Sequence, residues 1–299
     1  MERLISYLEE IKCEYETDVP MSSKTTFKIG GPARLVVYPD SEEKASLIVK
    51  KTNELAIRLI AVGNGSNLLV DDGGIDACVM VFDEHFAGIK LIGEDVIYAQ
   101  SGALLIRVCR FALEHGLSGL EFAYGIPGSC GGAAFMNAGA YGGEMRDVLY
   151  RCNHIDSNGD IGYIENEMLN LSYRHSAYYD NGCIITGIYL KLKKAPKEEI
   201  KSKMDDLLQR RKDKQPLEYP SAGSTFKRPV NAFAGALIEQ CGLKGKSVGG
   251  AQVSEKHAGF VVNRGGATCS DVLELCEHIR KTVLEETGFE LEMEIRVTR

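Results

Sequence analysis

Two glycine-rich segments carry the residues best suited to bind an anionic ligand. The first is Gly63-Asn64-Gly65-Ser66-Asn67, and the second runs over residues 125–134 and continues through residues 137–143. Bare backbone N–H groups in such loops form anion nests, and a following helix N-terminus favours negative charge. Two separate nests suit a pyrophosphate that carries a bulky group at each end. An ordinary loop and close backbone packing in a β-rich domain are the alternatives for the first and second segments.

A second set of residues offers hydroxyls and cations. Residues 220–229 place hydroxyls and two cations between prolines, which predicts a stiff polar loop able to present a hydroxyl. The basic cluster 210–216 lies at the end of a charged helix. The simpler interpretation is that these residues are solvated positive charges, which the helix dipole favours at that end. Arg174 lies in a tyrosine-rich stretch and is either a buried cation or a surface charge. His257 is interpreted as structural.

Three familiar motifs are excluded by their context. Residues 63–68 lack the third glycine of the dinucleotide fingerprint and precede a predicted strand instead of a helix. Gln240 stands where a P-loop ending at Lys246 and Ser247 requires glycine. The Gly-x-Ser-x-Gly run at 245–249 lies between a helix and a strand, in the wrong order for a hydrolase elbow. No histidine has a metal-ligand spacing, so we expect no metal site.

The composition indicates an ordinary globular protein with an acidic surface. The 299 residues carry a net charge of −7, which disfavours a general nucleic-acid binder but permits a local basic site. No apolar run approaches the roughly 18 residues of a membrane span, and residues 1–12 predict an amphipathic surface helix rather than a signal peptide. Nine cysteines without a CxxC pair are typical of reduced thiols, so we expect a cytoplasmic protein.

The elements that must position these groups begin with a β-rich first part. Short strands alternate with two helices, one of which is predicted to start at Asp40 with Glu43 completing a capping box. Asn158-Gly159 predicts a hairpin turn. Near residue 195 the composition changes from glycine-rich to strongly charged, which predicts the main domain boundary.

The second part predicts a small α+β unit. Helices are expected at 197–212, 232–240 and 270–286, and strands at 247–253 and 258–263. Residues 289–297 alternate apolar and charged side chains, which predicts a final strand with one charged face. The chain is therefore expected to be an α+β protein with domains at 1–195 and 196–299.

Taken in order, six short motifs resemble the UDP-N-acetylenolpyruvoylglucosamine reductase family, the FAD enzymes of bacterial peptidoglycan synthesis. They are residues 25–33, 63–67, 125–142, Tyr173-Arg174, Gly223-Ser224 and 294–296. The resemblance implies an FAD-binding domain of the vanillyl-alcohol oxidase type and a smaller α+β substrate-binding domain. Only Asn181-Gly182 separates residues 173–180 from the next predicted strand. The chain is therefore similar to the subclass that lacks the tyrosine-loop insertion.

The resemblance also implies a reaction. NADPH reduces FAD, and the flavin then delivers hydride to the enolpyruvyl ether of UDP-N-acetylglucosamine, which gives UDP-N-acetylmuramate. Arg174 matches the family's cation that stabilises the developing negative charge. Ser224 matches the residue that protonates the α-carbon, and Glu294 matches the acid that assists this transfer.

The predicted binding residues fall into two sets. The cofactor set is Gly63, Asn64, Gly65, Ser66, Asn67, Gly125, Pro127, Gly128, Ser129, Gly131, Gly132, Asn137, Gly139 and Tyr141. The set for the substrate and the nucleotide phosphates is Tyr173, Arg210, Lys214, Lys227, Arg228, Gln252 and His257.

Two other functions share part of this pattern. A different FAD oxidoreductase of the same fold has the glycine-rich loops but not Arg174, Ser224 and Glu294 together. A non-catalytic nucleotide-binding module predicts no flavin and no effect of Ser224→Ala. In the leading hypothesis the partners are the sugar nucleotide and NADPH, without nucleic acid or membrane, and the protein is a monomer or weak oligomer.

Overall fold

The computed structural model describes residues 1–299 and divides the chain into two compact units. Unit 1 contains Met1–Thr17, Leu35–Asn64 and Ala77–Arg210. Unit 2 contains Asp18–Arg34, Gly65–Asp76 and Arg211–Arg299. The units are therefore interleaved along the chain. The domain boundary near residue 195, which would divide the chain into two continuous domains, stays a prediction. No helix combines the length and the apolar character needed to cross a membrane.

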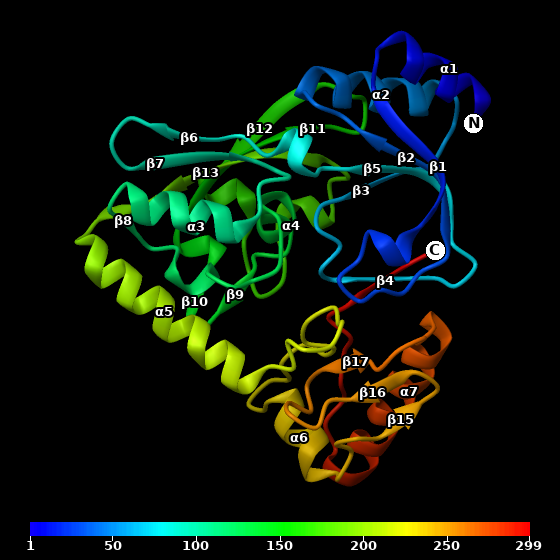
Figure 1. The fold of residues 1–299 in the computed structure, drawn as a ribbon, viewed down its shortest axis with the longest axis vertical. Coiled ribbons are helices and arrows are strands. Elements are labelled where there is room, and N and C mark those ends of the chain that lie inside the picture. The colour runs from blue at the N-terminus through cyan, green and yellow to red at the C-terminus, as the bar shows by residue number, and fades with distance from the viewer. The chain divides into compact units, whose positions relative to one another are not determined.

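One sheet, most of which belongs to unit 1, has the strand order β1-β2-β5-β3. Its strands are β1 (Glu14–Pro20), β2 (Pro32–Tyr38), β5 (Ile75–Val81) and β3 (Leu59–Val62), and β3 runs parallel to β5. Helices α1 (Glu2–Glu10) and α2 (Glu42–Glu54) contact each other above the strands in Figure 1. The predicted cap at Asp40 is wrong by one residue. Ser41 has the extended backbone of an N-cap, and its hydroxyl accepts the Lys44 N–H at 3.2 Å.

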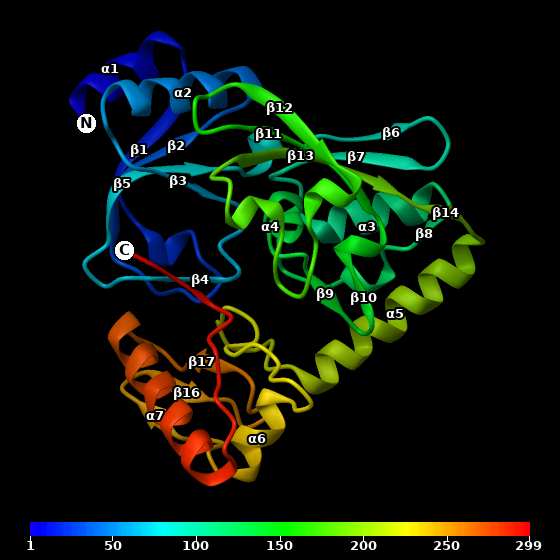
Figure 2. The ribbon, with the colours of Figure 1, turned by 180° about the vertical axis from the view of Figure 1, so that it is seen from behind.

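The second sheet of unit 1 is antiparallel, with the order β12-β11-β13-β7-β6. Its strands are β12 (Ile161–Glu165), β11 (Leu149–Ile155), β13 (Ile184–Lys191), β7 (Val96–Gln100) and β6 (Ile89–Ile92). The turn between β11 and β12 contains Asn158-Gly159 and confirms the predicted hairpin. Buried residues of this sheet share one core with α3 (Leu105–Glu114), α4 (Cys130–Phe135) and α5 (Lys197–Lys214), which Figure 2 shows from behind.

Short elements connect these larger ones in unit 1. The strands are β8 (Leu117–Ser118), β9 (Gly139–Ala140), β10 (Gly143–Glu144) and β14 (Lys193–Lys194). The 3-10 turns are η2 (Glu84–Phe86), η3 (Glu121–Ala123), η4 (Met145–Asp147), η5 (Asn166–Leu169) and η6 (Ala177–Tyr179). Of these, β9 and β10 lie at the end of the second glycine-rich segment, and η3 and η4 lie directly before and after it.

Unit 2 builds its core from distant parts of the chain. The strands β15 (Ser247–Val248), β16 (Ala251–Val253) and β17 (Val261–Asn263) form one sheet, and β18 (Arg296–Thr298) pairs in parallel with β4 (Leu68–Val70). Helices α6 (Ala234–Gln240) and α7 (Cys269–Thr287) pack with them, and η1 (Met21–Ser23) lies near the start of the unit. The predicted strand 247–253 is instead a hairpin, because Gly249 turns the chain at φ +50°.

The predicted strand over residues 289–297 is wrong as a single element. Met293 forms an isolated bridge with Phe226, whereas regular strand structure begins only at Arg296, against β4. The pairing partner therefore changes in the middle of the segment. The alternation correctly predicts that Leu291 and Ile295 are buried in the core of unit 2, but Val297, expected on the same face, is 39% exposed.

Candidate active site

An unsatisfied hydroxyl lies at the centre of the glycine-rich region of unit 1. Ser129 is buried, and its Oγ has no hydrogen-bond partner. Gly63 faces it so closely that a Cβ on Gly63 would lie 2.1 Å from that oxygen. Buried polar groups are nearly always paired, so this one calls for an explanation. A cofactor atom that accepts the hydroxyl proton beside the bare Gly63 backbone supplies one, and the residues fit the phosphate-bearing FAD predicted here.

The two glycine-rich segments are tied together within unit 1. The side-chain amide of Asn64 donates to the carbonyl of Pro127. The following residues are pinned to the chain before α3, because Leu105 N–H donates to Gly128 O at 3.0 Å and Gly131 N–H donates to Ser101 O at 3.0 Å. The Gly131 N–H is therefore engaged within the protein. Gly131 is buried, whereas Gly132 is exposed.

Asn137 organises the neighbouring loop through its side chain. Its Nδ2 donates to Glu144 Oε2 at 3.0 Å and to Ser172 O at 2.8 Å, and its Oδ1 accepts the Arg146 N–H at 2.8 Å. The backbone of this fully buried residue is left-handed, with φ +42°. Asn137 was predicted to bind the cofactor, and these contacts show that it also joins the glycine-rich loop to the chain before Tyr173.

Arg174 is thereby placed beside the same loop. Its Nη2 donates to Gly139 O at 3.3 Å, and its guanidinium lies 5.1 Å from the centre of the Tyr173 ring. Arg174 has φ +55°, a left-handed conformation that costs a residue with a side chain about 1–3 kcal/mol. Such strain is typical of functional sites, which agrees with the role predicted for this cation. Tyr173 and Tyr141 are both exposed.

Unit 2 brings Ser224 and Glu294 together. Thr225, which follows Ser224, accepts the Glu294 N–H on its carbonyl at 2.8 Å. Lys227 N–H donates to Glu292 O at 2.8 Å, and its ammonium pairs with the Glu292 carboxylate at 2.5 Å. The two proposed acid groups therefore lie on paired segments, with Lys227 engaged by a different carboxylate.

The first glycine-rich motif is divided between the units. Gly63 and Asn64 belong to unit 1, whereas residues 65–67 belong to unit 2. Gly65 has φ +59°, and a Cβ on it would lie 2.2 Å from the carbonyl oxygen of Lys24. Asn67 directs its Nδ2 to Glu294 O at 3.1 Å. A strand, β4, follows the motif, which confirms the prediction that no helix begins there and that the motif is not a dinucleotide fingerprint.

Three of the predicted substrate residues have partners within the protein. Arg210, the last residue of its unit 1 segment, pairs with Asp206 at 2.9 Å on the exposed surface of α5. Arg228 stacks on the ring of Phe233 with 4.7 Å to its centre. Gln252 donates to Gly245 O at 3.1 Å, inside the hairpin of β15 and β16. Their roles toward the substrate remain predictions.

His257 lies in a partly buried and basic setting in unit 2. Burial, reinforced by Lys244 and Lys214, lowers the pKa of His257 below its usual value. Its Nδ1 accepts the Gly259 N–H at 3.1 Å, which leaves the ring proton of the neutral form on Nε2. Lys214 thus lies near His257, so these two predicted substrate residues share one part of unit 2.

Sequence reasoning missed Thr225. This residue is 1% exposed and contacts two distant segments through its backbone and hydroxyl. A threonine beside a phenylalanine is common in buried strands, and its partners near residues 260 and 294 are far along the chain. No local signal distinguishes it.

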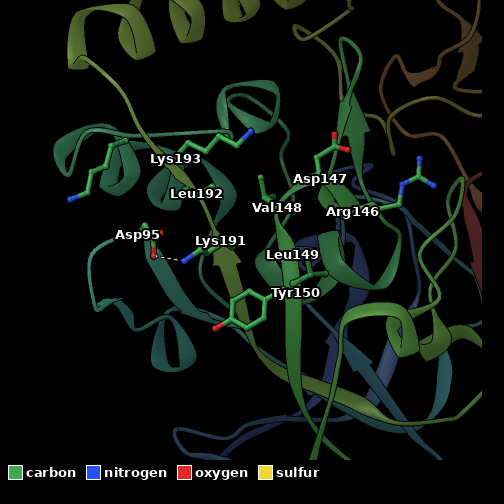
Figure 3. Close-up of a pocket in the computed structure, with 10 residues that line it drawn as sticks. Asp95, Arg146, Asp147, Val148, Leu149, Tyr150, Lys191, Leu192 and Lys193 are labelled. Carbon is green, nitrogen blue, oxygen red and sulfur yellow. Dashed lines mark hydrogen bonds and ion pairs between the residues drawn. The ribbon is translucent and has the colours of Figure 1, made fainter.

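A separate cavity of about 540 Å³ in unit 1 contains none of the predicted site residues. Figure 3 shows it at the start of β11 and the end of β13, where Lys191 reaches Asp95 at 2.7 Å. Arg146 pairs with Glu144, and Lys194 lies 4.0 Å from Glu94. Carboxylates therefore pair with most of the basic side chains that line this cavity. None of the predicted catalytic residues lies in it.

Comparisons with known proteins match two parts of the chain to two domain families. Residues 33–162 match the family described as "FAD binding domain", and residues 215–298 match the family described as "UDP-N-acetylenolpyruvoylglucosamine reductase, C-terminal domain". The α+β fold of an FAD-binding domain with this second domain is thus established, as predicted.

Whole-chain relatives extend the match to nearly every residue. A UDP-N-acetylenolpyruvoylglucosamine reductase of Clostridium perfringens (strain SM101 / Type A) is 50% identical over 281 residues, covering 94% of this chain and 91% of that protein. A reductase of the same name from Clostridium novyi (strain NT) is 48% identical over 286 residues, covering 96% and 92%. The crystal structure of the Thermus caldophilus reductase has a TM-score of 0.82 at 38% identity and covers 96% of this chain and 99% of that one. The chain belongs to the UDP-N-acetylenolpyruvoylglucosamine reductase family.

Proposed function

We propose that the chain is the NADPH-dependent reductase that converts UDP-N-acetylglucosamine enolpyruvate to UDP-N-acetylmuramate in peptidoglycan synthesis, with FAD as its cofactor. The proposal rests on the match to relatives of this name, which are about 50% identical to this chain over nearly their whole length. The unsatisfied Ser129 hydroxyl beside Gly63 supports the cofactor. The pairing of the Ser224 and Glu294 segments supports the reaction.

The residues of unit 1 have binding and electrostatic roles in this proposal. Ser129 and the backbone at Gly63 and Gly132 hold FAD, which supplies the relay of hydride from NADPH to the methylene carbon of the substrate. Arg174 stabilises the negative charge that develops on the substrate's α-carbon and carboxylate, because a preorganised cation costs no reorganisation during the reaction. Its contact with Gly139 O limits where the guanidinium can lie.

The residues of unit 2 supply the proton. The product needs one proton on the α-carbon, and the Ser224 Oγ–H donates it. A serine hydroxyl is a weak acid, so Glu294 assists the transfer, and general acid catalysis of this kind contributes about 10²- to 10⁴-fold. The subclass without the tyrosine-loop insertion is also proposed, since the chain passes directly from η6 to β13.

Ser224→Ala tests the assignment through the two half-reactions. We expect normal flavin content, normal bleaching of the flavin by NADPH under anaerobic conditions, and at least a 100-fold slower reoxidation by the sugar nucleotide. Ser221→Ala is the matched control, because Ser221 lies in the same loop and its hydroxyl accepts the Gly223 N–H at the long distance of 3.4 Å. Equal slowing of both half-reactions would reject the role of Ser224, and a protein that never binds flavin would favour a passive nucleotide-binding module.

The finer statements about partners are also proposals. A net charge of −7 supports the absence of a nucleic-acid partner. We infer a monomer or weak oligomer, without a membrane partner, that works in the cytoplasm, where NADPH is available. Light scattering on the purified 32.8 kDa chain measures the oligomeric state directly.

A further inference from the structure

Both backbone polar groups of Glu294, its N–H and its carbonyl, are hydrogen-bonded within unit 2. Its N–H donates to Thr225 O at 2.8 Å, and its carbonyl accepts the Asn67 Nδ2 at 3.1 Å. Glu294 lies where the segment changes partner, between the bridge at Met293 and the start of β18. No regular ladder covers that position, so these two contacts fix the backbone that carries the carboxylate.

Thr225 is itself fixed by two further contacts. Its N–H donates to Gly259 O at 2.9 Å, and its Oγ1 accepts the Val261 N–H at 2.8 Å. With its side chain fully buried, Thr225 joins the segment of Ser224 to β17 on one side and to Glu294 on the other. Any shift of Thr225 moves both proposed acid groups.

Asn67 is placed by the other neighbouring strand pair. Its backbone carbonyl accepts the Arg296 N–H at 2.9 Å, immediately before β4 and β18 pair in parallel. The side chain then reaches back to Glu294 O. Backbone pairing therefore sets the position of the amide that holds Glu294.

We propose that Thr225 and Asn67 are positioning residues that hold Ser224 and Glu294 in the geometry for proton transfer. This inference rests on the proposed roles of Ser224 and Glu294. Proton transfer requires heavy atoms within about 3 Å, and a misplacement of about 1 Å costs up to 100-fold in rate. The structure thus assigns the Asn67 side chain to the acid pair, although its motif predicted a cofactor ligand.

Asn64 provides a matched contrast three residues earlier in the same motif. Its side-chain amide donates to Pro127 O, within the cofactor segment of unit 1. Asn64→Ala is expected to weaken FAD binding, whereas Asn67→Ala is expected to leave FAD content intact and slow only the reaction with the sugar nucleotide. The two asparagines therefore separate cofactor support from acid positioning.

The experiment uses the flavin-loaded full chain and measures each half-reaction by stopped flow. Thr225→Val keeps the shape but removes the acceptor for Val261 N–H, whereas Thr225→Ser keeps the hydroxyl. We expect Thr225→Val and Asn67→Ala to lower the limiting rate of substrate reduction about 10- to 100-fold, with unchanged substrate affinity and unchanged flavin reduction by NADPH. Thr225→Ser should stay within about threefold of the wild-type rate.

The outcomes separate this inference from the proposed function. If Ser224→Ala and Glu294→Gln selectively lose substrate reduction but Asn67→Ala does not, the positioning role is wrong. Loss of FAD from Asn67→Ala, with a normal rate after reconstitution, also overturns it. If Ser224→Ala and Glu294→Gln slow both half-reactions equally, the proposed catalytic roles fail and the inference fails with them. Should Thr225→Val not fold, Asn67→Ala decides alone.

Discussion

The glycine-rich region of unit 1 and the proposed acid pair of unit 2, Ser224 and Glu294, are built on different physical principles. In unit 1, bare backbone and left-handed residues approach one another closely, as at Gly63 against Ser129 and at Asn137. In unit 2, ordinary extended segments are aligned by hydrogen bonds between residues far apart in sequence, as at Thr225 and Glu294. The first region depends on the absence of side chains, and the second depends on register.

This difference decides how each region responds to change. A single added methyl group is enough to disturb the close approaches of the glycine-rich region, whereas the paired segments that carry Thr225 and Glu294 should tolerate small side-chain changes unless these move a segment. The four predictions below test that contrast, starting with the largest expected effect.

Two adjacent glycines of unit 1 should differ sharply. A Cβ on Gly131 would lie 2.8 Å from the Cβ of Ser101, which is buried and hydrogen-bonded to Ile185 O, so Gly131→Ala should lower the free energy of unfolding by about 1–3 kcal/mol. A Cβ on Gly132 would meet only Ser129 Oγ, at 3.7 Å. Gly132→Ala should therefore keep the stability of the apoprotein but weaken FAD binding. Thermal unfolding and flavin titration separate the two, and equal destabilisation would contradict the distinction.

Acid should affect unit 1 through Glu121. Burial alone would raise its pKa, but hydrogen bonds from Ser118 and the Gly119 N–H, with the charge of Lys203, outweigh it, so the pKa of Glu121 lies below 4.5. A lowered pKa means that the stabilisation is present above pH 4.5 and is lost as pH falls through the folded-state value.

Glu121→Gln measures this contribution. The variant should lose about 1–2 kcal/mol at pH 7, because neutral hydrogen bonds replace those to the charged form, and should differ less from the wild type at acid pH. Denaturant unfolding of the apoprotein between pH 7 and pH 3.5 provides the comparison. A constant difference across that range would show that the charge of Glu121 contributes nothing.

Removal of the Ser129 hydroxyl should separate folding from cofactor binding. Its Oγ has no partner in the protein, so Ser129→Ala should leave the apoprotein at least as stable as the wild type. FAD should bind about tenfold more weakly, because one hydrogen bond of about 1.4 kcal/mol is lost. A titration followed by flavin fluorescence measures the affinity, and unchanged affinity would mean that this hydroxyl does not contact the cofactor.

The smallest expected effect is confined to unit 2. Thr268 caps α7, accepts the Asp271 N–H and forms a capping box with that residue. Thr268→Ala should cost about 1 kcal/mol of stability. FAD content and flavin reduction by NADPH should stay at wild-type levels. A change in flavin affinity would show that the stability of unit 2 is not separable from the cofactor region.

Local patterns predicted the parts of the fold whose causes are local. Glycine and proline marked the irregular segment 125–143, Asn158-Gly159 marked the hairpin, and the amphipathic pattern of residues 1–12 marked α1, in which Leu4 and Leu8 are buried. The cap of α2 was misplaced because Asp40 and Ser41 are both good N-caps, and only the backbone conformation selects Ser41.

The remaining features depend on contacts that spacing does not reveal. The alternation over residues 289–297 predicted the burial of Leu291 and Ile295, but not the exposure of Val297 or the change of partner at Glu294. The asparagines at 64 and 67 look equivalent in the sequence, although their side chains hold different structures. Thr225 was missed because its importance comes from hydrogen bonds to β17 and Glu294, neither of which is near it in the sequence.

The interleaving of the two units also limits how the protein can be cut into fragments. Phe27, Ile29 and Leu69 come from the first quarter of the chain, yet they are buried in the core formed with α6 and α7. A fragment that starts at Arg211 would lack them and leave an apolar cavity, and the complementary fragment would carry them exposed to water. Neither piece is a natural unit for expression, so an engineered division of this reductase must retain all three segments of each unit.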